Sequence, residues 1–155
     1  MKIEAGRKMN RQENLQTALK TLIQIIPTYK AHDCVIKLDG KEIKGKFLLI
    51  EIMNTSSIGP NLNLAPFANI EDGLFEVVLI PETQRAKLAS FVTGKKRGSI
   101  KGNSFQIELA KKVSISWSGK YAHIDDEGIK SDKEVKLNAE INKAALKFII
   151  PNRSN

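Results

Sequence analysis

The sequence predicts a mainly β protein: an antiparallel β-sandwich with one N-terminal helix and one short inserted helix. Three observations support this fold class. The last third of the chain alternates apolar and polar residues with the period of two that half-buried strands show. An Asp39-Gly40 turn signal joins two earlier apolar runs. Residues 10–26 instead place apolar side chains at the spacing of an amphipathic helix.

The size of the chain fits one domain over residues 1–155, able to bury roughly two thirds of the surface that its unfolded form exposes. Within it we expect a flexible start at 1–9, a helix at 10–26 and the sandwich at 31–151. The first helix has a capping pair in Asn10 and Glu13, and Pro27 follows its end.

The next segment predicts a hairpin and a central strand. Asp39-Gly40 suits a type I′ turn, and alternation places Cys34 on the apolar face of the first strand, where we interpret it as a small core residue. Residues 47–53 are apolar on both faces, as expected of a strand that is covered on both sides. The polar loop 54–60 follows it, in a position where binding residues often lie.

The remaining elements are a strand, a helix and a series of half-buried strands. A strand from Leu74 to Ile80 leads into a helix from Glu82 to Val92, closed by Gly94. Turns at Ser118-Gly119 and Glu127-Gly128 separate later strands. The apolar positions of the last strands are Phe105, Ile107, Leu109, Val113, Ile115, Trp117, Val135, Leu137, Ala139, Ile141, Leu146, Phe148 and Ile150.

Composition narrows the classes of function. The net charge is +8, which favours nucleic acid, an anionic membrane surface or acidic small molecules as partners. Basic residues such as Lys95, Lys96 and Arg97 are not interleaved with aromatic residues, so we expect a solvated face and no nucleic acid. No apolar run approaches the roughly 18 residues that span a bilayer. With a single cysteine and no apolar leader, the sequence indicates a cytoplasmic protein.

Most enzyme signatures are absent from the sequence. It holds no Gly-x-x-x-x-Gly-Lys-Ser/Thr, no Gly-x-Gly-x-x-Gly, no Gly-x-Ser-x-Gly and no cysteine cluster for zinc. Only His32 and His123 could serve a Ser-His-Asp triad, and neither has a recognisable nucleophile context. Covalent hydrolysis is therefore not expected.

Two acidic segments remain as candidates. In Pro66-Phe67-Ala68-Asn69-Ile70-Glu71-Asp72-Gly73-Leu74 a carboxylate and backbone carbonyls could hold Mg²⁺, although an ordinary Asp-Gly turn reads the same way. In the second segment, strand alternation would place His123, Asp125 and Glu127 on one face, as a metal set or a tuned general base. The alternative there is a solvated acidic turn.

The order of these segments resembles the C-terminal domain of the diacylglycerol kinase-like family of lipid kinases, which includes YegS-like, BmrU-like and sphingosine kinases. The resemblance runs from the first helix to Pro151. Its most specific part is Ala65-Pro66-x-Ala68 followed by Asp72-Gly73-Leu74, and Asp125-Asp126-Glu127 stands where the family has Asp-Gly-Glu.

The resemblance implies a site and a reaction. The metal site would consist of Asp72 with the carbonyls of Asn69 and Leu74 and would hold Mg²⁺. Glu127 would be the catalytic base on the lipid hydroxyl, and ATP would be the co-substrate. The family's Gly-Gly-Asp-Gly-Thr nucleotide motif lies in another domain and is absent from this sequence, so the chain alone should be inactive.

The resemblance also implies partners: a lipid substrate, and a nucleotide-binding domain in cis or in trans. The basic cluster Lys95, Lys96 and Arg97 could rest on an anionic membrane. A non-catalytic lipid- or partner-binding module is the alternative. The identity of the lipid and the oligomeric state, including a homo-oligomer, stay open.

Overall fold

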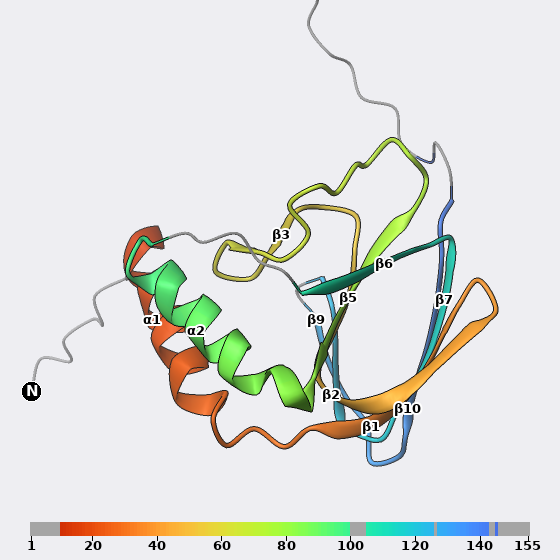
Figure 1. The fold of residues 1–155 in the computed structure, drawn as a ribbon, viewed down its shortest axis with the longest axis horizontal. Helices are drawn as coiled ribbons and strands as arrows, with labels where there is room; N and C mark the ends of the chain where they lie inside the picture. Colours follow the sequence, from red (N-terminus) through yellow and green to blue (C-terminus); the bar gives the residue numbers. More distant parts are fainter. Residues whose placement is uncertain (1–9, 100–104, 126, 143–144, 146–155) are drawn as a thin grey trace, which may run out of the picture.

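The computed structural model describes residues 10–99, 105–125, 127–142 and 145, and they form a mainly antiparallel β fold with two helices, which confirms the predicted class (Figure 1). The helices are α1 (Arg11–Ile25) and α2 (Arg85–Lys96), the latter preceded by a 3-10 turn at Glu82–Gln84. The strands are β1 (His32–Leu38), β2 (Lys41–Met53), β3 (Ser57–Ile58), β4 (Leu62–Asn63), β5 (Phe75–Pro81), β6 (Gln106–Ala110), β7 (Lys112–Trp117), β8 (Tyr121–Ile124), β9 (Glu127–Lys130) and β10 (Val135–Glu140).

The predicted helix cap at the start of α1 and the predicted turn between β1 and β2 are both confirmed. The side chain of Asn10 accepts a hydrogen bond from the Glu13 N–H at 2.9 Å, and the Glu13 carboxylate accepts from the Asn10 N–H at 2.9 Å. This capping box satisfies two of the backbone donors that a helix start leaves unpaired. At the hairpin, Asp39 and Gly40 have φ angles of +48° and +92°, as a type I′ turn requires.

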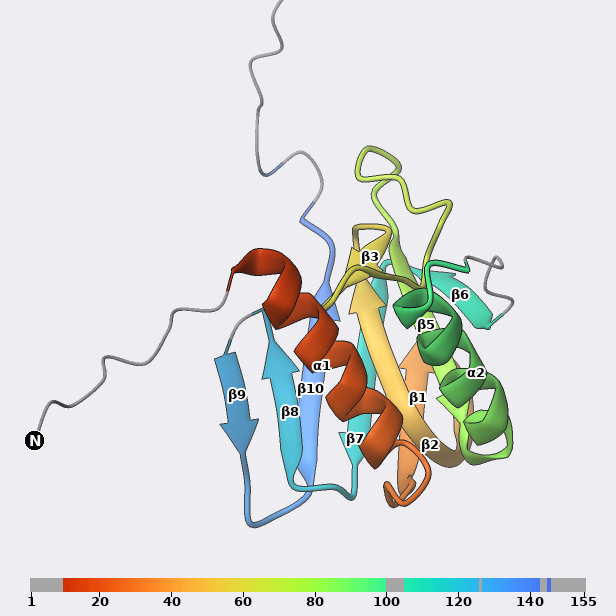
Figure 2. The ribbon, with the colours of Figure 1, turned by 90° about the vertical axis from the view of Figure 1, so that its left-hand side faces the viewer.

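Six strands form one sheet in the order β10-β7-β1-β2-β5-β6, with every neighbouring pair antiparallel. The register between β2 and β5 shifts between Phe47 and Leu49, so Leu48 is an extra residue in β2. A bulge of this kind bends a strand and increases its twist. The sheet curls, and α1 and α2 lie side by side across one of its faces (Figures 1 and 2).

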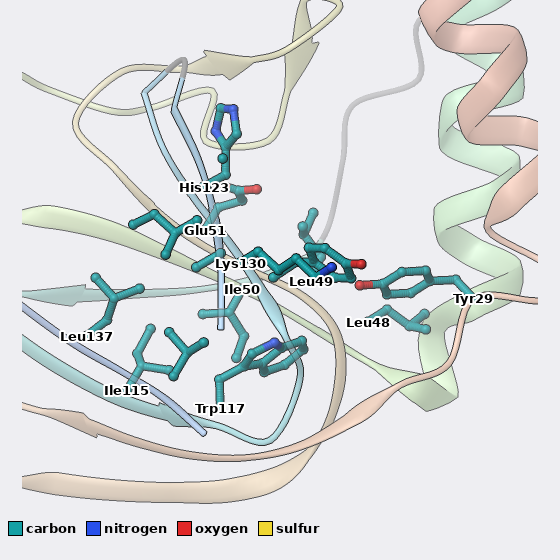
Figure 3. A pocket seen from close by; sticks show the side chains of 15 residues that line it. Tyr29, Leu48, Leu49, Ile50, Glu51, Ile115, Trp117, His123, Lys130 and Leu137 are labelled. Atoms are coloured by element: carbon teal, nitrogen blue, oxygen red, sulfur yellow. The ribbon is translucent and has the colours of Figure 1, made fainter. Parts of the chain in front are cut away.

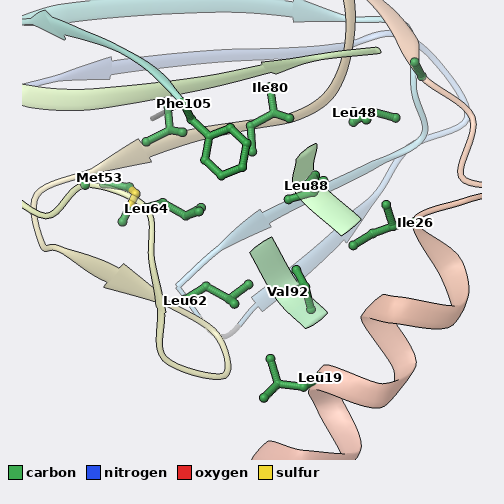
Figure 4. Close-up of a cluster of buried hydrophobic side chains, with 13 residues drawn as sticks. Leu19, Ile26, Leu48, Met53, Leu62, Leu64, Ile80, Leu88, Val92 and Phe105 are labelled. Atoms are coloured by element: carbon green, nitrogen blue, oxygen red, sulfur yellow. The ribbon is translucent and has the colours of Figure 1, made fainter. Parts of the chain in front are cut away.

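Two apolar clusters fill the two sides of the sheet. One lies beneath the helices and joins Leu19 of α1 and Val92 of α2 to the sheet and to the loops that follow β2 (Figure 4). The other lies on the opposite face and gathers buried residues of β1, β2, β5 and β7, including Ile36, Val77 and Leu79, which are fully buried. Because the curled sheet has a core on each side, a strand near its middle such as β5 is buried on both faces and shows no alternation in burial.

Cys34 belongs to the second cluster and is 3% exposed, which confirms the prediction that it is a core residue. Burial raises the pKa of its thiol to about 12, and the negative charge of Glu134 adds to that rise. The thiolate is the reactive form of cysteine. Cys34 is therefore a packing residue with little nucleophilic character.

Two expectations about elements are corrected, and a third falls outside the described residues. The second helix starts at Arg85 and runs through Gly94, and the chain turns only at Gly98, whose φ is +71°. A glycine in a helix interior costs stability but does not by itself end the helix, so it was a weak stop signal. The later turn lies at Asp125, φ +50°, and not at Glu127-Gly128, which belong to β9. The predicted flexible start at 1–9 and the apolar positions 146–150 lie outside the described residues.

Asp39 fastens the β1–β2 turn to the β6–β7 turn. Its carboxylate accepts hydrogen bonds from the N–H groups of Lys111 and Lys112, and its own N–H donates to the Lys112 carbonyl at 3.0 Å. Those two N–H donors hold the pKa of the Asp39 carboxyl below its usual range. These contacts extend the β1–β7 pairing up to the β6–β7 turn.

We expect Asp39→Asn to reduce stability mainly above the ordinary carboxyl pKa. A carboxyl whose pKa is lower in the folded state contributes stability that is present above its unfolded pKa and is lost as the pH falls through its folded pKa. Urea unfolding at pH 7 should show the variant to be less stable, and the difference should shrink as the pH falls below 4. An equal deficit at both pH values would contradict this interpretation.

Candidate functional site

A pocket of about 580 Å³ opens where β2 runs beyond the strand beside it. β1 pairs with β2 only from Lys41 to Phe47, so the second half of β2 has no β1 neighbour. The β8–β9 hairpin borders the pocket beside this stretch of β2. The bulge at Leu48 adds one residue to β2 at this point, and both Leu48 and Leu49 line the pocket.

The lining of the pocket is predominantly apolar. Figure 3 shows Ile115, Trp117 and Leu137 on the sheet side and Tyr29 on the helix side, with His123 at the rim (Figure 3). The lining residues are Tyr29, Leu48, Leu49, Ile50, Glu51, Ile115, Trp117, Tyr121, Ala122, His123, Gly128, Ile129, Lys130, Val135 and Leu137. Such a cavity, apolar with a few polar groups, is the usual form of a small-molecule site.

Two of the aromatic rings that line the pocket, Tyr29 and Trp117, both contact the ring of His32. The rings of His32 and Trp117 lie 5.2 Å apart between centroids, and those of Tyr29 and His32 lie 6.3 Å apart, edge to face. Gly119 allows Trp117 its position, because a Cβ at residue 119 would clash with the indole Nε1. A larger residue there would force the indole or the adjoining backbone to shift.

A second, smaller pocket of about 280 Å³ adjoins the first. It lies between α1, α2 and β2 and shares Tyr29, Leu48 and Leu49 with its larger neighbour. Exposed apolar side chains stand at the rims, among them Ile25 on α1 and Ile129 on β9. The two hollows therefore border one another along the bulged part of β2.

Glu51 is the carboxyl group of the larger pocket. It pairs in register with Val78, on the face of the sheet that the helices cover. Burial raises the pKa of its carboxyl, and the nearby His123 opposes that rise. The Glu51 carboxyl therefore favours its neutral form more than an ordinary glutamate does, and a neutral carboxyl both donates and accepts hydrogen bonds.

We expect Glu51→Gln to raise the free energy of unfolding at pH 7. A carboxyl whose pKa is higher in the folded state binds more protons there, so stability falls as the pH rises from the unfolded pKa through the folded one. The variant should lack this fall in urea titrations between pH 4 and pH 7. Glu71→Gln, at an exposed position, should leave the pH profile unchanged; a parallel gain from it would show a general effect of charge instead.

Glu127 begins β9 and is exposed, opposite Ile124 of β8. The hairpin turn reverses the alternation, since His123 pairs with Gly128 and faces the pocket while Glu127 shares a side with Ile124. The prediction that His123, Asp125 and Glu127 share one face is therefore wrong. No group of three His, Cys, Asp or Glu side chains suited to a metal occurs in the described part of the chain.

The turn from Asn69 to Leu74 brings the three predicted metal ligands into one loop. The Asp72 carboxylate accepts the Leu74 N–H at 2.9 Å, and the Asp72 N–H donates to the Asn69 carbonyl at 3.4 Å. Gly73 takes a φ of +71°, which closes the turn. The donors are carboxylate and carbonyl oxygens, which suit a hard cation such as Mg²⁺.

Two acidic residues near these sites were missed by sequence reasoning. Glu51 interrupts the apolar run of β2, and Glu76 lies within the apolar strand β5, where it is 4% exposed. The sequence did contain one signal for them: each is a single acidic residue inside an apolar strand. Acidic residues are almost never fully buried unless they have a partner. The side on which each carboxylate lies depends on the strand register, which the sequence did not define.

The basic cluster predicted for membrane contact lies at the end of α2. Lys95 and Lys96 occupy the last helical turn and Arg97 caps it. Cations at a helix C-terminus interact favourably with the helix dipole, so this position of the cluster also suits the helix. None of the helices in the described ranges is both long and apolar enough to cross a membrane.

Comparison with known proteins identifies relatives over much of the chain. The chain is 23% identical over 108 residues to a diacylglycerol kinase of Bacillus subtilis (strain 168), covering 64% of this chain and 36% of that protein. It is 31% identical over 94 residues to a diacylglycerol kinase of Staphylococcus aureus (strain Newman), covering 60% of this chain and 30% of that one. The chain thus spans about a third of the length of these relatives.

Solved structures show the same fold. A diacylglycerol kinase crystal structure from Bacillus anthracis str. Sterne superposes with a TM-score of 0.60 at 18% identity, covering 83% of this chain and 44% of that one. Another structure from that organism gives a TM-score of 0.56 at 16% identity, covering 88% and 44%. The family model described as the YegS C-terminal NAD kinase β-sandwich-like domain matches residues 3–149. The chain therefore belongs to the diacylglycerol kinase-like family, as its YegS-type C-terminal β-sandwich domain.

Proposed function

We propose that this chain is the lipid-binding, catalytic-cleft half of a diacylglycerol kinase-like enzyme. Together with a nucleotide-binding domain, in cis or in trans, it would transfer the γ-phosphoryl group of ATP to a lipid hydroxyl. The observation that carries the proposal is the apolar 580 Å³ pocket bordered by the same hairpin that holds Glu127. The names of the relatives agree with a lipid kinase.

The pocket suits an acyl chain in chemical character. Aliphatic and aromatic side chains dominate its lining, and burying apolar surface stabilises a bound chain by about 25 cal/mol per Å². Glu51, His123 and Lys130 are the polar groups of the lining that could orient a headgroup or an ester. This arrangement favours an uncharged lipid with one polar end.

Glu127, which lies at the exposed tip of the hairpin and does not line the pocket, would act as the general base on a lipid hydroxyl that extends beyond the pocket rim. Its carboxylate would accept the proton of the lipid hydroxyl while that oxygen forms a bond to the γ-phosphorus of ATP. The bond from that phosphorus to the bridging oxygen of ADP breaks, which leaves ADP and a lipid phosphate monoester. Phosphoryl transfer depends mainly on positioning and on stabilisation of charge, so the nucleotide-binding domain is indispensable.

Asp72 and the carbonyls of Asn69 and Leu74 would hold Mg²⁺. Hard oxygen donors fit this ion, which proteins commonly bind through one or two carboxylates while it retains several water molecules. Glu76 provides a second indication, because one of its carboxylate oxygens is buried near this turn without a hydrogen-bond partner. When bound, the ion would supply positive charge; the residues of the turn supply its position.

Fluorescence of Trp117 tests the lipid part of the proposal directly, because it is the single tryptophan of the chain and lines the pocket. We expect a brominated diacylglycerol to quench this fluorescence in a saturable way. Ala122→Phe should weaken binding by about tenfold, or ~1.4 kcal/mol, because its ring fills part of the pocket. Ala86→Phe, on the exposed side of α2, is the matched control. Equal weakening by both variants, or no quenching, would overturn the lipid assignment.

A further inference from the structure

We propose that Glu76 provides a second carboxylate to the cation site at the turn from Asn69 to Leu74. The inference rests on the cation part of the proposed function and gives a role to a residue to which the family resemblance assigned none. It rests on three features of Glu76: its burial, its single hydrogen bond and its position at the start of β5.

Glu76 is buried in a way that an isolated carboxylate is not. It is 4% exposed and is the one charged residue among the buried residues in the described part of the chain. Burying a carboxylate costs free energy unless hydrogen bonds, an opposite charge or a metal replaces the lost water. We therefore expect the buried Glu76 carboxylate to have a hydrogen-bond donor, an opposite charge or a metal ion beside it.

Only half of the Glu76 carboxylate has a partner among the described residues. Oε1 accepts the Asn69 N–H at 3.2 Å, whereas Oε2 is buried and has no hydrogen-bond partner. None of the ion pairs between described residues includes Glu76. A cation is the species that an anionic oxygen without a donor favours most.

The single hydrogen bond of Glu76 places its carboxylate at the cation turn. Oε1 contacts the backbone of Asn69, one of the three proposed ligand residues, and Oε2 shares the same carboxyl carbon. Glu76 opposes Met53 in the register of β2 and β5, so its backbone is fixed in the sheet. The other proposed ligands belong to a turn, whereas Glu76 belongs to a strand of the sheet.

The resulting donor set suits Mg²⁺ better than a softer metal. It contains two carboxylates, from Asp72 and Glu76, and the carbonyls of Asn69 and Leu74. All of these donors are oxygens, and proteins commonly bind Mg²⁺ through one or two carboxylates. Exposed Asp72 faces solvent and can retain water on the ion, while Glu76 would hold the ion from the interior.

The test compares Mg²⁺ binding to four forms of the chain by calorimetry and by thermal unfolding in EDTA and in millimolar Mg²⁺. These are the wild type, Glu76→Gln, Asp72→Asn and the control Glu71→Gln. Glutamine keeps the Oε1 acceptor for the Asn69 N–H but removes the charge. Glu71 belongs to the same turn and is exposed, so its variant makes the same change of charge without the burial.

We expect Glu76→Gln to bind Mg²⁺ at least about tenfold more weakly than the wild type, and Asp72→Asn to lose binding. Glu71→Gln should stay within about twofold, since an exposed charge is screened by water. In EDTA, Glu76→Gln should melt no lower than the wild type, because it no longer buries an unpartnered charge. In Mg²⁺ the wild type should gain thermal stability and Glu76→Gln should not.

Two results would overturn the inference, and they are distinguishable. Weak binding by Asp72→Asn with wild-type binding by Glu76→Gln would remove Glu76 from the site and leave the cation proposal in place. No Mg²⁺ binding by the wild type would remove both, while the lipid test at Trp117 would be unaffected.

A measurement on the wild type covers the case in which Glu76→Gln does not fold. With ¹³C in the glutamate side chains, Mg²⁺ should shift the carboxyl resonance of Glu76 and leave that of Glu71 in place. A shift at Asp72, observed with ¹³C-labelled aspartate, without one at Glu76 would contradict the inference.

Discussion

Replacing Glu127 by Gln should lower kcat by about 100-fold or more in an enzyme restored by joining this chain to the remainder of the Staphylococcus aureus diacylglycerol kinase, outside the segment that this chain matches. Glutamine preserves the size of the side chain but cannot accept the proton of the lipid hydroxyl. The KM for the lipid should change little, because a general base acts mainly in the transition state. Steady-state kinetics with a short-chain diacylglycerol measures both constants.

Glu134→Gln is the matched control for this prediction, because it makes the same change at an exposed position in the segment between β9 and β10. It should keep kcat within about twofold of the restored wild type. If Glu127→Gln instead keeps full activity, the catalytic role is refuted and the exposed hairpin tip is an ordinary acidic turn.

Arg85→Ala should lower the free energy of unfolding by about 2 kcal/mol, since hydrogen bonds to charged groups contribute roughly 1.5–3 kcal/mol each and Arg85 is partly exposed. The guanidinium Nη1 donates to the carbonyls of Ile26 and Tyr29 at 2.6 and 2.7 Å. These carbonyls follow the end of α1, so Arg85 ties the start of α2 to that end. Urea unfolding followed by circular dichroism measures the loss.

The same substitution should also affect the pocket, because Tyr29 lines both hollows and its backbone is held by Arg85. Arg97→Ala, an exposed arginine at the other end of α2, is the control and should change stability by less than about 0.5 kcal/mol. Arg85→Lys should fall between the two, since a lysine ammonium lacks the planar fork of a guanidinium. Equal losses for both alanine variants would show that the contact to α1 is unimportant.

Sequence signals that act over a few residues gave correct elements. Asn10 and Glu13 form the predicted capping box, and Asp39-Gly40 forms the predicted turn, because each depends only on its own backbone. The burial of Cys34 followed from alternation in β1. The turn with Asn69, Asp72 and Leu74 was found through the family motif, and whether it binds a cation stays a prediction.

The features that the sequence did not predict depend on strand register and on packing. The bulge at Leu48 shapes the pocket, yet no residue type marks it in the sequence. Alternation could not show that His123 and Glu127 lie on different sides, because it fails across a hairpin turn. Glu51 and Glu76 looked like polar interruptions of apolar strands until their neighbours across the sheet were defined.

Phosphate transfer from labelled ATP to diacylglycerol in micelles tests the central claim most directly. The chain alone should give no lipid phosphate. The chain joined to the remainder of the Staphylococcus aureus diacylglycerol kinase should give lipid phosphate, and neither part should give it by itself. Product from the chain alone would contradict the account. So would the absence of product from the joined protein while Trp117 still reports lipid binding, since the chain would then be a non-catalytic lipid-binding module.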